Sequence, residues 1–334
     1  MRNATTLHDL PTPALWIDVA ALEHNLHAMS AVLPGHRLRP HVKAHKSSML
    51  ARRQAAQGHR GFTCATAREV IGLADAGLGE DLLLANELVD PERLRVLATL
   101  DARVTVAVDS RETIAAAAKA GISEVLIDVN VGLPRCGCSP EQAGELGERA
   151  HRAGLKVRGV MGYEGHIVGI PEAQRREQGC ADAMALLEQA HRAVGGDVIS
   201  AGGTGTFDCN QLATEIQAGS YALMDTAYGK LGMPFRQALF IESTVISVSA
   251  DFAVADCGLK ALGMDHGAPD IETGSVWFCS DEHLTFAPGG ACEVGDRLRI
   301  VPAHVDPTVA YHESLHVISG EEVVEVWKVD LRGW

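Results

Sequence analysis

The feature that most constrains the fold is a regular alternation of short β-branched runs and Ala- and Leu-rich runs between residues 38 and 220. Such an alternation is typical of repeated strand–helix units on a parallel sheet. Eight runs have the length and composition of strands: Leu38–Lys43, Gly61–Ala65, Asp81–Ala85, Ala102–Asp109, Glu124–Val129, Val157–Tyr163, Asp197–Ala201 and Thr214–Gln217. Because about eight parallel strands close a barrel, the pattern predicts a TIM-type (β/α)8 barrel in an α/β protein.

The segments between these strands have apolar residues at every third and fourth position, which predicts helices with one buried face. Several of them begin with a Ser, Thr or Asp cap. They cover Thr66–Ala76, Asp90–Leu100, Ser110–Ala120, Ser139–Ala153 and Glu172–Val194.

After about Phe240 the helical pattern gives way to strand-like runs that Gly, Pro and Asp interrupt. This change predicts an antiparallel β domain without a helix. Pro13–Asp18 has no place among the barrel strands, so we expect it to join the β domain. The expected domains are a barrel over residues 20–238 and a β domain made of 1–19 and 239–334.

Charge and composition exclude several classes of partner. A formal net charge of −14 argues against binding to nucleic acid or to an anionic membrane surface. No uncharged stretch approaches the roughly 18 residues of a membrane span, and no signal peptide opens the chain, so we expect a cytoplasmic protein. The eight cysteines are scattered. We expect them to be reduced, with no disulfide framework.

Polar residues at the expected strand ends are candidates for an active site, because the active sites of barrels form there. Lys43 ends the first strand, where a lysine between apolar walls can lose its proton and form a Schiff base; a solvated rim charge is the alternative. Small-residue loops follow the seventh and eighth strands, at Ala201–Thr206 and Ala218–Tyr221. Their N–H groups can approach a phosphate, although tight turns also need glycine. Lysine and phosphate loops together suggest pyridoxal phosphate, with Arg135 and Tyr163 suited to contact its ring.

The chain contains, in order, the motifs RPHVKAHKS, VGLPRCG, GYEGH, GGTGT, QAGSY, DCGLKAL, SDEH and PAHVDPT. With this set it resembles, over nearly its whole length, the D-threonine aldolase and D-serine dehydratase group. The resemblance implies the alanine racemase fold, a homodimer, and pyridoxal phosphate bound by Lys43 rather than Lys46. It also implies cofactor contacts from Arg135, Tyr163, Gly203, Thr204, Ser220 and Tyr221.

The PAHVDPT motif separates His304 from Asp306 by one residue, so on a strand both side chains would lie on one face and could share a metal. Without context such a pair is usually an ordinary surface pair. The resemblance gives His and Asp to the aldolase branch, where a carboxylate ligand favours Mn²⁺ or Mg²⁺ over Zn²⁺. The implied reaction is retro-aldol cleavage of a small D-β-hydroxy amino acid, such as D-threonine, to glycine and an aldehyde.

Two alternatives to the aldolase stay open: a metal-assisted dehydratase of D-serine or D-3-hydroxyaspartate, and a non-catalytic pyridoxal-phosphate carrier. The resemblance also has one departure, because relatives often carry a histidine where this chain has Gly169. His166 is the nearest replacement as a base, and a loop histidine without catalytic role is an equal alternative. Asp225 and Asp256 are expected to be structural hydrogen-bonding groups.

Overall fold

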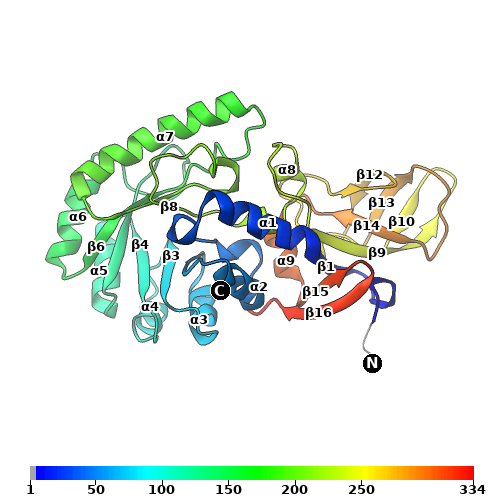
Figure 1. Ribbon diagram of the computed structural model, residues 1–334, viewed down its shortest axis with the longest axis horizontal. Helices are drawn as coiled ribbons and strands as arrows, with labels where there is room; N and C mark the ends of the chain where they lie inside the picture. Colours follow the sequence, from blue (N-terminus) through cyan, green and yellow to red (C-terminus); the bar gives the residue numbers. More distant parts are fainter. Residues whose placement is uncertain (1–4) are drawn as a thin grey trace. The chain divides into compact units, whose positions relative to one another are not determined.

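The structure is a computed structural model that describes residues 5–334 (Figure 1). The chain forms two compact units. The barrel unit comprises Met29–Lys43, Leu50–Gly219 and Leu331–Trp334. The β unit comprises the described residues up to Ala28, together with Ala44–Met49 and Ser220–Asp330.

The barrel unit contains a sheet of seven parallel strands in the order β2-β3-β4-β5-β6-β7-β8. Because each strand pairs with the next strand along the chain, all carboxyl ends lie at one end of the sheet. The bounds are β2 Gly61–Cys64, β3 Asp81–Glu87, β4 Val104–Val108, β5 Glu124–Asp128, β6 Lys156–Gly162, β7 Val198–Ala201 and β8 Glu215–Ile216.

The segment Leu38–Lys43, which was predicted as the first barrel strand, is not a regular strand in the structure. Pro40 has no N–H to donate to a ladder, and Val42–Ala44 forms a 3-10 turn. The segment nevertheless makes a parallel bridge from Leu38 to Ile216 of β8 and another from His41 to Thr63 of β2. It therefore closes the ring of strands, and the predicted TIM-type barrel is confirmed with an irregular first strand.

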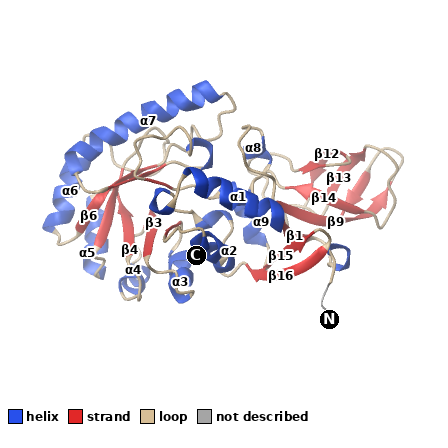
Figure 2. Cartoon of the chain, viewed as in Figure 1, coloured by secondary structure: helices blue, strands red, loops and turns tan. Residues whose placement is uncertain are grey.

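Helices follow the barrel strands and lie on the outer side of the sheet (Figure 2). Three of them begin where the sequence predicts, since the side chains of Thr66, Asp90 and Ser110 accept backbone N–H groups at the first turns of α3, α4 and α5. The helix predicted from Ser139 begins later, at Ala143, where no side chain caps it. The bounds are α3 Ala67–Asp75, α4 Pro91–Ala98, α5 Arg111–Ala120, α6 Ala143–Arg152 and α7 Ala173–Val194. Two helices contain residues of both units, α1 Val19–Val32 and α2 Ser48–Ala56.

The β unit is built on a mostly antiparallel sheet in the order β12-β13-β10-β9-β1-β15-β16, with β14 paired to β9 and β11. As expected, β1 joins this sheet, pairing antiparallel with β9 and parallel with β15. The strands of this sheet are β1 Ala14–Asp18, β9 Leu239–Val248, β10 Ala253–Ala255, β11 Asp270–Ile271, β12 Gly274–Cys279, β13 Leu284–Pro288, β14 Arg297–Val301, β15 Ser314–Ser319 and β16 Glu322–Lys328. The unit also contains α8 Thr226–Gly229 and α9 Val305–Tyr311. The prediction that no helix follows Phe240 was therefore wrong, because α9 does.

Two sequence-based exclusions can be compared with the structure. Within residues 5–334, no helix is long and apolar enough to cross a bilayer. All eight cysteines are free thiols, which confirms that no disulfide framework holds the fold.

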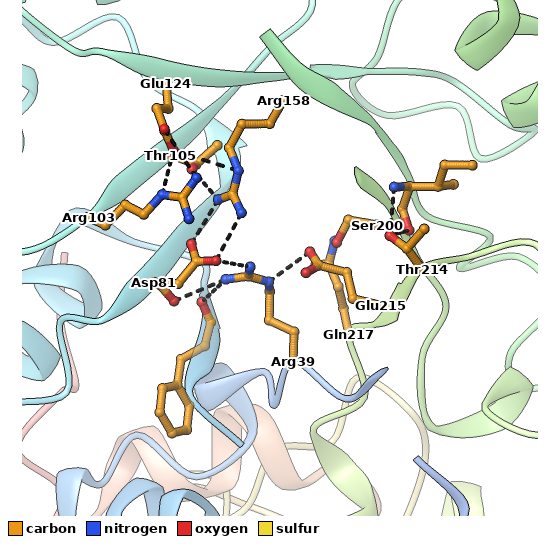
Figure 3. Close-up of polar contacts among 12 residues, drawn as sticks. Arg39, Asp81, Arg103, Thr105, Glu124, Arg158, Ser200, Thr214, Glu215 and Gln217 are labelled. Atoms are coloured by element: carbon orange, nitrogen blue, oxygen red, sulfur yellow. Dashed lines mark hydrogen bonds and ion pairs between the residues drawn. The ribbon is translucent and has the colours of Figure 1, made fainter. Parts of the chain in front are cut away.

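A buried ion-pair network lies at the amino ends of the barrel strands (Figure 3). The Arg39 guanidinium donates to Glu215 at 2.7 Å and to Asp81 at 2.8 Å, and Arg158 donates to both carboxylate oxygens of Asp81. Burial alone would raise the pKa of Asp81, but hydrogen bonding by Arg158 and the charge of Arg39 lower it to about 2. This contribution to stability is present above the ordinary carboxyl pKa and is lost as pH falls toward 2. The amino ends of barrel strands commonly serve stability rather than catalysis.

Replacing Arg39 with methionine should destabilise the barrel strongly. The Arg39 side chain is 4% exposed and the Glu215 side chain 9%, so the substitution leaves a buried carboxylate without its cation. Breaking a buried pair in this way costs about 3–5 kcal/mol of unfolding free energy, measured by urea denaturation. Arg60→Ala is the control, because the Arg60–Glu80 pair is exposed and should contribute about 0–1 kcal/mol. Equal midpoints for the two variants would contradict the role assigned to the network.

Candidate active site

Lys43 lies in the 3-10 turn that follows the barrel-closing segment, at the carboxyl ends of the strands. Its neighbours Val42 and Ala44 are fully buried, and Lys43 itself is half-buried. Lys46 has a different use, since its Nζ donates to the backbone oxygen of Asp306 at 2.7 Å within the β unit. The surroundings of Lys43 therefore match those of a lysine whose amine can react. Lys46 instead holds the backbone at Asp306 in place through its hydrogen bond.

The glycine-rich loop after β7 is held by a buried carboxylate that the sequence did not single out. Glu164 accepts the N–H of Gly202 at 3.2 Å and the hydroxyl of Thr206 at 2.7 Å. The N–H of Gly203 donates to Thr206 at 3.2 Å. These bonds fix the loop around Gly203 and Thr204, where the phosphate of a cofactor is expected. A buried acid inside the GYEGH motif is the signal that could have identified Glu164.

Glycine is required in this loop because other groups approach it closely. A Cβ at Gly205 would lie 1.8 Å from the carbonyl oxygen of Val168. Gly202 has a φ of +83°, which favours glycine. A Cβ at Gly203 would meet the Tyr163 ring and a Val168 methyl group, both at 3.4 Å. The loop thus presents backbone rather than side chains next to the Tyr163 ring.

Arg135 and Tyr163 come from neighbouring strand ends and meet. Tyr163 directly follows β6, and the Arg135 guanidinium lies 5.4 Å from the centre of its ring. The structure therefore brings Arg135, Tyr163 and Gly203 together, which are three of the residues that the sequence assigned to a cofactor.

His166 is exposed and lies against the loop that follows β5. The His166 ring lies beside Gly132, whose φ of +125° favours glycine. Gly169 is also exposed, and a Cβ there would meet nothing within 4 Å. The position therefore has room for the histidine that the resemblance predicts, and His166 stays a hypothesis as its replacement.

Two further carboxyl groups end barrel strands, Glu87 on β3 and Asp128 on β5. Burial, and then the charge of Glu87, raises the pKa of Asp128 well above its usual range. Burial and the neighbouring negative charge thus both favour the protonated form of Asp128. The sequence analysis did not identify either group. An acidic residue at the end of an apolar strand is nevertheless a pattern that indicates a site residue in a barrel.

Ser220 and Tyr221 belong to the β unit, in the 3-10 turn Ser220–Ala222. Both are buried, and the Tyr221 ring packs on Phe235 with 5.7 Å between ring centres. The Tyr221 ring is thus part of a hydrophobic core. The predicted cofactor contact of this loop stays a prediction.

His304 and Asp306 are not on a strand, so that part of the prediction was wrong. His304 is the N-cap of α9, and Asp306 lies in its first turn. A proline within the first turn and an acid near the helix amino end both favour a helix start, and this signal in HVDPT was overlooked. The turn still brings the pair together, with 3.5 Å between His304 Nε2 and Asp306 Oδ2.

The backbone around this pair is tied down by buried groups. Asp225 caps α8 and also accepts the N–H of Val305 at 3.0 Å, which agrees with the structural role expected for it. Burial by itself lowers the pKa of His304. The hydrogen bonds and negative charges of Asp306 and then of Asp265 outweigh burial, so the pKa of His304 is raised. Asp265 Oδ2 lies 2.7 Å from His304 Nδ1, and the sequence did not indicate this contact.

Two family models match the chain. The alanine racemase N-terminal domain matches residues 17–227, and the putative serine dehydratase domain matches residues 238–318. The chain belongs to the D-threonine aldolase and D-serine dehydratase family. Its alanine racemase-type fold and its lyase class are therefore as the sequence predicted, and membership of this family supports pyridoxal phosphate as the cofactor.

Individual members of the family resemble the whole chain. A D-threonine aldolase of Arthrobacter is 35% identical, covering 97% of this chain and 93% of the relative. A 3-hydroxy-D-aspartate aldolase of Paracoccus denitrificans is 33% identical with the same coverage. The crystal structure of D-threonine aldolase from Filomicrobium marinum superposes with a TM-score of 0.94 at 32% identity. The superposition covers 100% of this chain and 99% of the aldolase. The structure of D-threo-3-hydroxyaspartate dehydratase from Delftia superposes with a TM-score of 0.84 at 28% identity. The superposition covers 99% of this chain and 100% of the dehydratase.

Proposed function

We propose that the enzyme cleaves D-β-hydroxy amino acids of the D-threonine type to glycine and an aldehyde, using pyridoxal phosphate and a divalent metal. The observation that carries the proposal is the His304–Asp306 pair at the start of α9, in a chain of this family. Its second member is a carboxylate. Carboxylate oxygen suits Mn²⁺ or Mg²⁺, ions that hold and polarise hydroxyl groups.

The barrel unit has residues that fit pyridoxal phosphate. Lys43 would hold the cofactor covalently, and Arg135 and Tyr163 would contact its ring. The loop at Gly203 and Thr204 would hold the phosphate. The Gly203 N–H already donates to Thr206, so Gly203 would give the phosphate room, because it presents no side chain beside Tyr163, and Thr204 would supply the contact. Ser220 and Tyr221 are proposed to complete these contacts. When bound, the cofactor supplies an electron sink for bonds to the substrate Cα.

The residues at the start of α9 also fit a divalent ion. The 3.5 Å between His304 Nε2 and Asp306 Oδ2 allows both atoms to reach one ion, since metal–ligand bonds to nitrogen and oxygen are about 2.0–2.2 Å. The backbone bonds from Val305 to Asp225 and from Lys46 to Asp306 keep the pair in place before an ion arrives. The ion would lower the pKa of the substrate β-hydroxyl.

His166 is the proposed base that takes the β-hydroxyl proton. It is exposed, and its ring lies beside Gly132 in the loop that follows β5. An imidazole nitrogen that carries no hydrogen can accept a proton from a hydroxyl group, which suits this step.

The products of the reaction test the proposal. The enzyme is incubated with D-threonine or D-threo-phenylserine, pyridoxal phosphate and Mn²⁺, with L-threonine as the matched control. We expect glycine and the corresponding aldehyde from the D substrates only. Ammonia and a 2-keto acid would instead identify a dehydratase of D-serine or D-3-hydroxyaspartate type. Cofactor binding without any turnover would identify a non-catalytic carrier.

We also propose that the enzyme works as a homodimer in the cytoplasm. Its eight cysteines are all free thiols, as a reducing compartment requires. The exposed aromatic side chains of Trp277 and Phe278 on β12, 52% and 56% exposed, support contact with a second copy.

A further inference from the structure

We infer that Asp265 is a positioning residue that sets the tautomer and ring orientation of His304, so that His304 Nε2 becomes the metal-binding atom. The inference rests on the proposed metal pair and goes beyond it, because Asp265 acts through His304 and need not touch the ion. All the contacts that carry it lie within the β unit.

The first step concerns the proton on His304. Asp265 Oδ2 lies 2.7 Å from His304 Nδ1, and an ionised carboxylate can only accept a hydrogen bond. The hydrogen of a neutral imidazole is therefore held on Nδ1. This leaves a lone pair on Nε2, the atom that lies 3.5 Å from Asp306 Oδ2. A carboxylate on the far nitrogen is the common support for a metal-binding histidine, because it fixes the ring and raises its basicity.

The second step concerns the plane of the ring. His266 stacks on His304, with 3.8 Å between ring centres and 9° between the planes. A parallel neighbour at this distance prevents the His304 ring from turning about its side-chain bond. Asp265 therefore fixes one nitrogen, and His266 fixes the plane.

The third step concerns how Asp265 is kept beside His304. The Thr308 hydroxyl donates to the His304 carbonyl at 2.7 Å and accepts the N–H of Gly263 at 2.9 Å. A Cβ at Gly263 would lie 2.2 Å from Pro307, so glycine is needed for this approach. The segment that carries Asp265 is thus bound to the first turn of α9 by a buried bond.

A competing arrangement uses Asp265, His266 and His304 as three ligands, because one donor atom of each lies within 4.8 Å of the others. The 2.7 Å separation favours the hydrogen bond instead, since it leaves no room for an ion between Nδ1 and the carboxylate. His266→Phe separates the two arrangements, because phenylalanine keeps a stacking ring and removes the nitrogen ligands.

The test measures the Mn²⁺ affinity of the cofactor-loaded enzyme by titration calorimetry. Asp265→Ala should weaken Mn²⁺ binding about 10–100-fold, the range seen when a supporting partner of a metal-binding histidine is lost. Asp265→Asn should recover part of the loss, because its amide oxygen still accepts from Nδ1. His266→Phe should bind Mn²⁺ nearly as well as the parent enzyme. Asp251→Ala, which removes an exposed carboxylate of the same unit, is the charge control.

Folding does not obscure these results, because the Asp265 side chain is 57% exposed and its removal leaves no cavity. The metal-free melting temperature and the cofactor absorbance band should therefore match those of the parent enzyme. Unchanged Mn²⁺ affinity in Asp265→Ala, alongside a clear loss in His304→Ala, would overturn the role of Asp265 alone. A loss in His266→Phe as large as in His304→Ala would overturn it in favour of the three-ligand site. Unchanged affinity in His304→Ala would show that the proposed metal pair itself is wrong.

Discussion

Replacing Lys43 with alanine is expected to remove the near-visible absorbance band of the lysine-bound cofactor and to reduce turnover about 1,000-fold or more. In the absence of substrate, this band requires an imine bond between the cofactor aldehyde and a lysine amine of the protein, because that bond extends the conjugation of the ring. Lys43 has the half-buried position and the buried apolar neighbours that keep such an amine reactive.

Lys46→Ala is the matched control for this prediction. Lys46 donates to the Asp306 carbonyl, so its loss should leave the absorbance band intact and affect the proposed metal pair. Absorbance spectroscopy and a turnover assay of both variants measure the two effects. A band that persists in Lys43→Ala and disappears in Lys46→Ala would transfer the cofactor lysine to position 46.

Replacing Asp306 with alanine is expected to leave that band intact while removing most of the cleavage activity. A metal that polarises the β-hydroxyl contributes several kcal/mol to the transition state, so we expect a loss of about 100-fold or more. His304 alone is a poor site for a hard ion, because hard ions need oxygen ligands. Chelation of the parent enzyme should reproduce the loss, and added Mn²⁺ should reverse it only in the parent.

Asp306→Cys provides a sharper version of the same experiment. A thiolate is a softer ligand, so the metal preference should move from Mn²⁺ toward Zn²⁺. Dehydratase activity is not required to appear, because it also needs a base for the Cα proton. Full metal-dependent activity in Asp306→Ala would place the ion elsewhere in the protein.

Several features of this protein could be predicted because they depend on local sequence. The barrel follows from the alternation of apolar runs with amphipathic segments, and the caps Thr66, Asp90 and Ser110 mark helix starts through bonds to residues three positions ahead. The pairing of β1 with the later sheet followed from its having no place in the barrel. Ordered motifs also identified the family, because each motif is a contiguous run of residues.

The structure of PAHVDPT was misjudged because periodicity and local start signals disagreed. The run GDRLRIVPAHVD lies among the strand-like runs after Phe240, which suggested a strand, but Asp306 and the following proline start α9. His304 and Asp306 are still neighbours, since the first turn of a helix also brings nearby side chains together. The pairing was therefore predicted correctly from the wrong element.

The sequence by itself determined the barrel, the β sheet, the family and the principal candidate residues, because strand and helix periods and short motifs are local properties of the chain. Only the tertiary structure decided which distant groups support those residues. Asp265 reaches His304 across 39 positions, and Glu164 reaches Thr206 across 42. Such contacts depend on how loops from different strands converge. No periodicity records that convergence, because a polar side chain at a loop position has the same local pattern whether its partner is water or a buried group.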